Sequence, residues 1–237
     1  METSLSFAKM RTNARLAGAL YLLIIVSGLF SELFVRSGMI VPGNAVATTE
    51  NIAANPFLFR IGFISDLIMV MSDVGVALLL YLVLKPVNKG MSMLAAFFRL
   101  AQATVLGINL LNYFMPVLLL DQAGYLNSFN VEQTQSLVLL FLNAHAYGYL
   151  ISGVFFGISC VVLGSLIFKS WYFPKWLGVL VAAAGFSYLI DCIVNFLFPE
   201  LTATSELLVM TVAVISELSL CLFLLIKGVG KQFSEYQ

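Results

Sequence analysis

The sequence has 237 residues, of which 61% are hydrophobic and 10% are charged, and its mean hydropathy is +1.00. Soluble domains carry about a quarter charged residues, so this composition excludes a water-solvated protein and predicts one that lies in lipid. The 12 basic and 12 acidic residues cancel and form no basic run, which argues against nucleic-acid binding.

Residue types that bind metals are too few and too scattered to form a site. There is one His, and the three cysteines, Cys160, Cys192 and Cys221, lie inside apolar segments without a CxxC or His/Cys cluster. Such spacing does not match a zinc site or a disulfide framework. The sequence therefore predicts no metal and no cofactor.

Six apolar segments are each long enough to cross a bilayer as a helix, which takes roughly 20 residues. Turn-forming stretches separate them, such as Pro42-Gly43-Asn44 and the residues from Asp121 to Asn130. In chain order, the expected spans cover about residues 14–35, 57–84, 92–119, 135–168, 175–198 and 205–226. The predicted fold class is all-α, a polytopic membrane helix bundle of six transmembrane helices that forms a single domain over residues 1–237.

Basic residues near the ends of these spans lie almost entirely on one side. Nine of them precede the first span, follow the sixth, or lie in the second-to-third and fourth-to-fifth connections: Lys9, Arg11, Arg15, Lys85, Lys89, Lys169, Lys175, Lys227 and Lys231. The opposite loops hold only Arg36. Flanking basic residues stay in the cytoplasm, so both termini are predicted to be cytoplasmic.

Ionisable residues also occur inside the expected spans. An ionisable side chain at bilayer depth costs at least ~2.5 kcal/mol on insertion scales, so it is expected to face the protein interior, a partner or water. Glu32 and Arg60 lie near the outer surface, where their side chains can reach water. The remaining ones are Asp66 and Asp73 in the second span, Arg99 in the third, His145 in the fourth, Asp191 in the fifth and Glu217 in the sixth.

Depth in the membrane follows from the helical rise of about 1.5 Å per residue. Counted from the outer helix ends, Asp66, Asn112, His145 and Glu217 fall at a similar level, and Asp191 lies slightly nearer the surface. These five residues form the predicted binding group for a small solute or a proton.

The two aspartates of the second span are expected to have different partners. Asp66 and Asp73 are seven residues apart, which is two helical turns, so both face the same way. Arg99 enters the next span from the cytoplasmic end and is predicted to form a structural ion pair with Asp73. No basic residue is expected at the level of Asp66, whose carboxyl group is predicted to be protonated or to exchange protons.

Two further patterns concern packing and anchoring. On the fourth span, the run Gly153-Val-Phe-Phe-Gly157 with Gly164 predicts a face that packs closely against another helix of the chain. Near the next connection, aromatic residues cluster beside two lysines and predict an anchor at the membrane interface: Trp171, Tyr172 and Trp176 with Lys169 and Lys175.

Several blocks of the sequence resemble one family. They include Arg15-Leu-Ala-Gly-Ala-Leu-Tyr-Leu, Leu58-Phe-Arg-Ile-Gly-Phe-Ile-Ser-Asp-Leu and His145-Ala-Tyr-Gly-Tyr-Leu. The set is similar to the domain-of-unknown-function family numbered 4386, uncharacterised membrane proteins mostly of bacteria. This resemblance implies a multi-span protein of the bacterial cytoplasmic membrane and implies no activity or substrate. Asn44 stands where the family pattern has Asp, which speaks against a charged role at that position.

Three functions fit these features. Polar groups of Asp66, His145 and Glu217 at one depth favour a small-solute or proton-coupled transporter, because membrane proton relays use these residue types. The alternative is a non-catalytic membrane scaffold or partner subunit whose buried charges only fix helix register. A third is an intramembrane Ser/His hydrolase, since Gly185-Phe-Ser187 resembles half of a GxSxG turn. Leu189 replaces the second Gly of that motif, so an enzyme is disfavoured and no catalytic residue is assigned.

Overall fold

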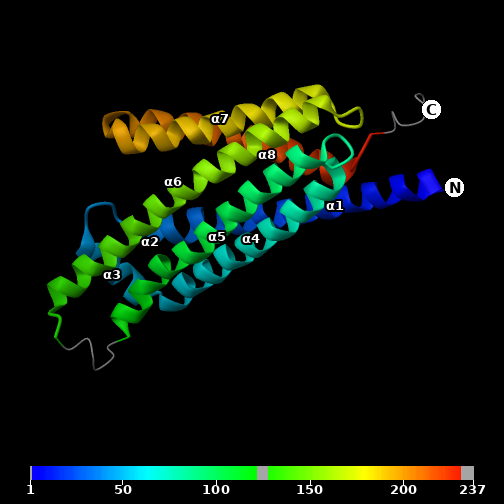
Figure 1. Ribbon diagram of the computed structural model, residues 1–237. Coiled ribbons are helices and arrows are strands. Elements are labelled where there is room, and N and C mark those ends of the chain that lie inside the picture. Colours follow the sequence, from blue (N-terminus) through cyan, green and yellow to red (C-terminus); the bar gives the residue numbers. More distant parts are fainter. Residues whose placement is uncertain (1, 122–127, 231–237) are drawn as a thin grey trace. The chain divides into compact units, whose positions relative to one another are not determined.

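The computed structural model describes residues 2–121 and 128–230, and in this part of the chain every regular element is helical (Figure 1). The elements are α1 (Glu2–Leu29), η1 (Phe30–Arg36), α2 (Ser37–Met39), α3 (Ala45–Ala54), α4 (Pro56–Leu84), α5 (Lys89–Leu120), α6 (Val131–Lys169), α7 (Lys175–Leu197), η3 (Pro199–Leu201) and α8 (Thr202–Ile226). The predicted all-α class is confirmed. Lys231 and most of the expected turn at 121–130 lie outside the described residues.

Six helical stretches are long and apolar enough to cross a membrane: Phe7–Met39, Pro56–Leu84, Lys89–Leu120, Val131–Lys169, Lys175–Leu197 and Pro199–Ile226. Their length and composition agree with an integral membrane protein. The first stretch corrects the prediction of a span that ends near residue 35. Its helix continues through the π-helical turn η1 and α2 to Met39, so Arg36 belongs to the helix and not to an outer loop.

The described residues fall into two compact units, divided within α1 after Leu22, within α4 after Met71, within α5 after Ala103 and within α6 after Tyr149. Unit 1 contains α7, η3 and α8 together with the remaining ends of the four divided helices, and unit 2 contains η1, α2 and α3. Each unit is described by itself below.

In unit 2, a tight turn leads from α2 into α3. Asn44 N–H donates to the Val41 carbonyl over 3.0 Å, and Gly43 takes a φ of 73°, a conformation that glycine adopts without strain. The Asn44 side chain then accepts a hydrogen bond from Ala47 N–H over 3.0 Å and caps α3. A neutral amide supplies this cap, so the position works here without a charge.

The apolar core of unit 2 surrounds the ring of Tyr113 on α5. Phe59 stacks on this ring with centroids 4.5 Å apart, and the Tyr113 hydroxyl donates to the Phe59 carbonyl over 3.2 Å. Other buried members come from η1, α2, α3, α5 and α6: Val35, Met39, Ile52, Leu119, Val138 and Leu142. This packing holds α3 against the spans and places the first turns of α4 beside the end of α5.

In unit 1, α6 and α7 approach each other through glycines. A Cβ atom added at Gly164 would lie 2.6 Å from both the Ala182 nitrogen and the Gly178 carbonyl oxygen, and one added at Gly157 would lie 2.8 Å from the Gly185 carbonyl oxygen. The glycine face predicted on the fourth span thus packs within the chain. Small residues at such crossings let helix backbones come close enough for dispersion contacts to hold them.

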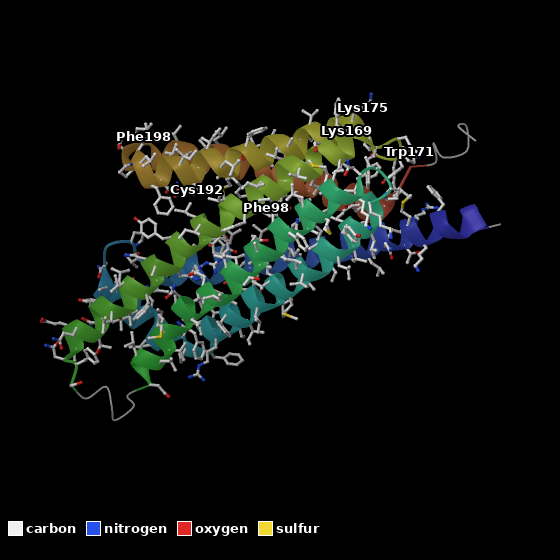
Figure 2. All side chains as sticks on the ribbon, viewed as in Figure 1. Phe98, Lys169, Trp171, Lys175, Cys192 and Phe198 are labelled. Atoms are coloured by element: carbon white, nitrogen blue, oxygen red, sulfur yellow. The ribbon has the colours of Figure 1, made fainter. Side chains whose placement is uncertain are left out.

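The connection from α6 to α7 carries the aromatic and basic residues of the predicted anchor. Lys169, Trp171 and Lys175 lie together at one end of the α6–α7 pair, and Phe198 lies beyond the other end of α7 (Figure 2). Tyr172 is buried and its hydroxyl donates to the Val83 carbonyl over 2.7 Å. Burial also raises the pKa of the Tyr172 hydroxyl, which keeps it protonated as a donor.

We expect Gly164→Ala to destabilise the protein, because overpacking at a tight contact costs about 1–3 kcal/mol. Gly153→Ala on the same helix is the matched control, since its added Cβ would find its nearest neighbour at 4.0 Å. Thermal unfolding in detergent should give a lower melting temperature for Gly164→Ala alone. Equal melting temperatures for the two variants would show that the helices are not held by this contact.

Candidate functional site

Unit 2 contains a buried polar group that we call the Asp66 cluster: Ser31, Arg36, Asp66, Tyr113, His145 and Tyr149. The Arg36 guanidinium contacts the Asp66 carboxylate through Nη1. The same nitrogen donates to Ser31 Oγ over 3.0 Å, and Ser31 Oγ donates to the Gly62 carbonyl over 3.2 Å. The Asp66 side chain is fully buried, so its charge is balanced inside the protein by a cation that sequence reasoning had assigned to a loop.

The π-helical turn explains why Arg36 points inward. In an α-helix, Ser31 and Arg36 would be separated by about 140° around the helix axis, because successive residues turn by about 100°. A π-helix bonds residue i to residue i+5, which brings two residues five apart onto one face. Ser31, Val35 and Arg36 are accordingly the buried residues of this turn.

Arg36 also holds a second carboxylate. Its Nε donates to Glu32 Oε2 over 2.8 Å, and the Glu32 side chain is 55% exposed whereas that of Arg36 is 10% exposed. One guanidinium therefore joins a carboxylate at the protein surface to a carboxylate in the interior. Because Arg36 bonds both carboxylates, it can exchange one carboxylate partner for the other.

Two tyrosine rings connect Arg36 to His145. The Arg36 Cζ lies 5.8 Å from the Tyr113 ring centroid and 5.7 Å from that of Tyr149. His145 meets the same two rings edge-on, with centroids 5.3 Å and 5.7 Å away. A cation over aromatic faces is stabilised by the ring quadrupole, most strongly where water is excluded.

His145 and Asn112 are linked through Asn109. His145 Nδ1 lies 3.2 Å from the Asn109 carbonyl oxygen, and Asn109 Nδ2 donates to the His145 carbonyl over 2.8 Å. Asn112 Nδ2 donates to Asn109 Oδ1 over 3.0 Å. Among the described residues, His145 Nε2 and Asp66 Oδ1 are buried without a hydrogen-bond partner.

Unit 1 contains a second group, the Asp73 cluster: Tyr21, Asp73, Arg99, Gln102 and Phe156. Arg99 donates to Asp73 Oδ1 from Nε over 2.9 Å and from Nη2 over 2.6 Å, and Gln102 Nε2 donates to Asp73 Oδ2 over 3.2 Å. The Arg99 Cζ lies 4.9 Å from the Tyr21 ring centroid and 5.0 Å from that of Phe156. The cluster thus joins α1, α4, α5 and α6.

Glu217 and Asp191, the other two members of the predicted binding group, belong to unit 1 and have local partners. Tyr188 on α7 donates its hydroxyl to Glu217 Oε1 over 2.6 Å. Asp191 Oδ1 accepts from Ser205 Oγ over 2.7 Å and from Asn195 Nδ2 over 3.1 Å. Both carboxyl groups connect α7 to α8, whereas Asp66, His145 and Asn112 share unit 2.

The serine of the Ser/His hydrolase hypothesis, Ser187, is buried on α7. Ser187 Oγ donates to the Ala184 carbonyl over 2.8 Å, so its hydroxyl is bonded to the helix backbone. A nucleophilic serine instead needs its hydroxyl bonded to a base. In the described part of the chain, no three His, Cys, Asp or Glu side chains converge as metal ligands.

Comparison with known proteins identifies the family. The family model "Domain of unknown function (DUF4386)" matches residues 16–228. The chain belongs to the DUF4386 family. One relative of this DUF4386 chain is an uncharacterized protein of Archaeoglobus fulgidus, 32% identical over 129 residues, which cover 54% of this chain and 64% of the relative. The match therefore spans less than two thirds of that relative, and no solved structure matches the chain.

Breaking the Arg36–Asp66 pair should destabilise the protein strongly. We expect Asp66→Asn to cost about 3–5 kcal/mol, because it leaves a buried cation without its interior carboxylate. Glu32→Gln removes the exposed partner of the same arginine and should cost at most about 1 kcal/mol. Unfolding by SDS titration in mixed micelles measures both variants.

The double variant Arg36→Met/Asp66→Leu tests the same pair without leaving a charge. Replacing a buried ion pair by apolar groups of similar size is often neutral, so this variant should recover most of the stability that Asp66→Asn loses. If the double variant were less stable than Asp66→Asn, the pair would not be the contact that sets the cost.

Proposed function

We propose that this chain is a small proton-coupled membrane transporter in which α4 carries two exchange sites, Asp66 and Asp73, each paired with an arginine. The observation that carries the proposal is the shared position of Arg36 between buried Asp66 and exposed Glu32. A proton arriving at Asp66 neutralises its carboxylate and weakens the hold on Arg36. Glu32 then remains as the second carboxylate bonded to Arg36, so the arginine keeps a counter-charge at the protein surface.

The cost of these charges supports a functional role. Each ionisable residue at bilayer depth costs at least ~2.5 kcal/mol on insertion scales. Apolar side chains join membrane helices without that cost. Charged residues inside membrane segments commonly mark pathways for protons or solutes, and the two clusters contain Asp, Arg and His side chains of that kind.

Unbonded polar atoms support the same role. Among the described residues, Asp66 Oδ1 and His145 Nε2 in one cluster, and Arg99 Nη1 and Gln102 Oε1 in the other, are buried without a hydrogen-bond partner. A buried polar atom left without a partner costs about 1–3 kcal/mol, so a bound group that bonded these atoms would gain free energy. These atoms are the ones that a proton carrier or a polar solute would bond.

A narrow cavity reaches the Asp73 cluster. Its volume is about 10 Å³, and its lining includes Tyr81, Ser92, Arg99 and Ser159 from α4, α5 and α6. Most of the other lining residues are alanines and leucines, so among the described residues Arg99 is the one charged group that reaches this space.

The proposed location is the cytoplasmic membrane, with both termini in the cytoplasm. With Arg36 counted as a helix residue, residues 37–56, 121–130 and 199–204 contain no Lys or Arg. The connections on the other side contain Lys85, Lys89, Lys169 and Lys175. By the positive-inside rule, this asymmetry supports cytoplasmic termini.

A scaffold function is the competing proposal. It is favoured by the hydrogen bonds to Asp73, which occupy both of its carboxylate oxygens. Three donor atoms hold its carboxylate, which is the arrangement expected of a fixed helix clamp. Under this proposal the charges set helix register only, and variants that keep the fold keep the function.

Labelling of introduced cysteines tests the orientation. Ser37→Cys lies between α1 and α3 and should react with a membrane-impermeant maleimide in intact cells. Lys89→Cys, at the α4–α5 connection, should react only after the cells are permeabilised. The native cysteines are buried and give a low background. The reverse labelling pattern would place the termini outside.

Charge movement in proteoliposomes tests transport. Proteoliposomes on a solid-supported membrane are given an inward proton gradient and then a rapid addition of one solute pool. The pools are amino acids, nucleosides, sugars and small amines. We expect at least one pool to produce a current. The folded double variant Arg36→Met/Asp66→Leu should lower that current to the level of protein-free liposomes, because it has no exchangeable carboxyl group at Asp66. Glu32→Gln should slow the current without abolishing it.

A current from none of the pools contradicts the transport proposal. So does a double variant that is as active as the wild type. If the double variant folds and has the same oligomeric state as the wild type but carries no current, a scaffold role for the charges is excluded.

A further inference from the structure

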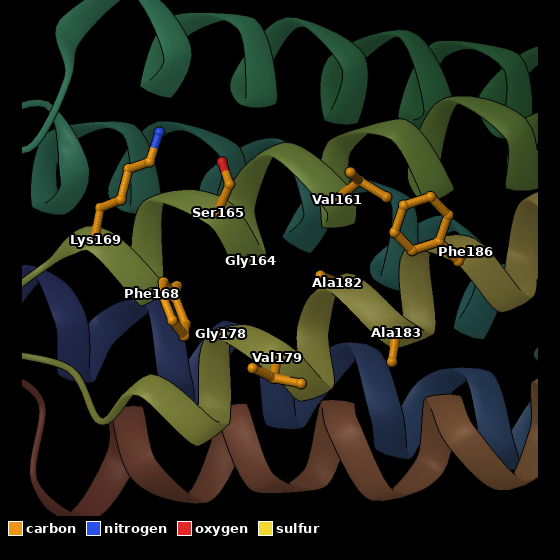
Figure 3. Close-up of a pocket in the computed structure, with 10 residues that line it drawn as sticks. All are labelled: Val161, Gly164, Ser165, Phe168, Lys169, Gly178, Val179, Ala182, Ala183 and Phe186. Atoms are coloured by element: carbon orange, nitrogen blue, oxygen red, sulfur yellow. The ribbon is translucent and has the colours of Figure 1, made fainter.

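An apolar groove lies between α6 and α7, away from both polar clusters of the proposed function. Its volume is about 440 Å³ (Figure 3). Phe168 and Lys169 lie at one end of the groove and Phe186 at the other. On α6 the lining runs from Val161 to Lys169, a length of about 12 Å along the helix.

Small residues, Gly164, Gly178, Ala182 and Ala183, form much of the groove lining at the α6–α7 crossing. Gly164 and Gly178 line the groove and bring the two backbones into contact, since an added Cβ at either would lie 2.6 Å from the opposite backbone. Val179 and Phe186 border the groove and are each 55% exposed. On a membrane-spanning helix such exposure faces lipid, so hydrocarbon and not water covers this surface.

One end of the groove is positively charged. Lys169 closes α6 and lines the groove, and Lys175 opens α7 with its Nζ 5.6 Å from the Phe168 ring centroid. The first turn of α7 adds the partial positive charge of a helix N-terminus. No acidic residue occurs in the sequence between Glu132 and Asp191, so nothing on α7 before Asp191 or on most of α6 offsets these cations.

We propose that the groove binds one anionic phospholipid, with an acyl chain along the α6–α7 crossing and the headgroup phosphate beside Lys169 and Lys175. The apolar walls match an acyl chain, and the two lysines match a phosphate. Basic pockets between transmembrane helices bind anionic headgroups in this way, and each basic residue near the membrane surface contributes electrostatic attraction. The inference does not depend on transport.

The two tryptophans of the chain provide a direct readout. Trp171 and Trp176 flank the charged end of the groove, and both side chains are exposed. Lipids with brominated acyl chains quench tryptophan fluorescence on contact. In mixed liposomes, brominated phosphatidylglycerol should quench the wild type at a lower mole fraction than brominated phosphatidylcholine does. The expected preference is about fivefold for each lysine beside the headgroup, because the choline cation of phosphatidylcholine offsets its phosphate charge and phosphatidylglycerol has no such cation.

Variants separate this site from general attraction of anionic lipid. Lys169→Gln/Lys175→Gln should remove the preference for phosphatidylglycerol, whereas the matched pair Lys85→Gln/Lys89→Gln at the α4–α5 connection should keep it. Ala183→Phe fills the groove from its exposed side and should reduce the preference with both lysines present. Leu222→Phe, on the exposed face of α8, is its control and should have no effect.

Equal quenching by the two lipids in the wild type overturns the proposal, as does an equal loss of preference in both lysine pairs. A second copy of the chain is the competing occupant of the groove. Efficient cross-linking of Ala183→Cys between copies, with no lipid preference, would assign the groove to a dimer interface.

Discussion

Pairing of buried arginines with aspartates is the interaction on which the rest of the structure depends. In water either charge would be solvated at little cost, but in hydrocarbon an unpaired guanidinium or carboxylate is expensive. Asp66 and Asp73 must therefore find partners on other helical segments, and they find Arg36 and Arg99. Each pair fixes the rotation of the helices that carry it, because a helix turned by a few residues would carry its charge into lipid.

Much of the fold could be predicted from the sequence. Six stretches of apolar residues imply six helices, since no other open structure satisfies its backbone groups in lipid. The pairing of Asp73 with Arg99 was also predictable, because the two residues lie on consecutive spans near the same end of the helix bundle. The Arg36–Asp66 pair was not, because the π-helical turn moves Arg36 from the expected loop onto the buried face. One signal was available: Arg36 was the only basic residue in the outer loops, an exception that a buried carboxylate explains.

Counting depth along a helix gives only part of the geometry of a site. A rise per residue gives the height of a side chain in the membrane, but not the direction in which it points. Within unit 1, Tyr188 on α7 bonds Glu217 and Ser205 on α8 bonds Asp191, which connects these two helices. A serine or tyrosine hydroxyl on a neighbouring helix is a good hydrogen-bond partner for a carboxyl group. Such residues are so common in the sequence that the actual partner cannot be predicted. Of the predicted group of five, Asp66, His145 and Asn112 lie in unit 2, whereas Asp191 and Glu217 lie in unit 1.

The two clusters differ in what happens when the aspartate takes a proton. Arg99 bonds the Asp73 carboxylate and lies over two aromatic rings, so neutralising Asp73 would remove the carboxylate that Arg99 bonds directly. Arg36 keeps Glu32 when Asp66 is neutralised, and Glu32 reaches the surface. The Asp66 cluster can therefore change its charge at lower cost than the Asp73 cluster. If α4 serves transport, Asp66 is the aspartate that takes up a proton first. Separating Asp73 from Arg99 requires a larger rearrangement or an incoming polar group beside Arg99.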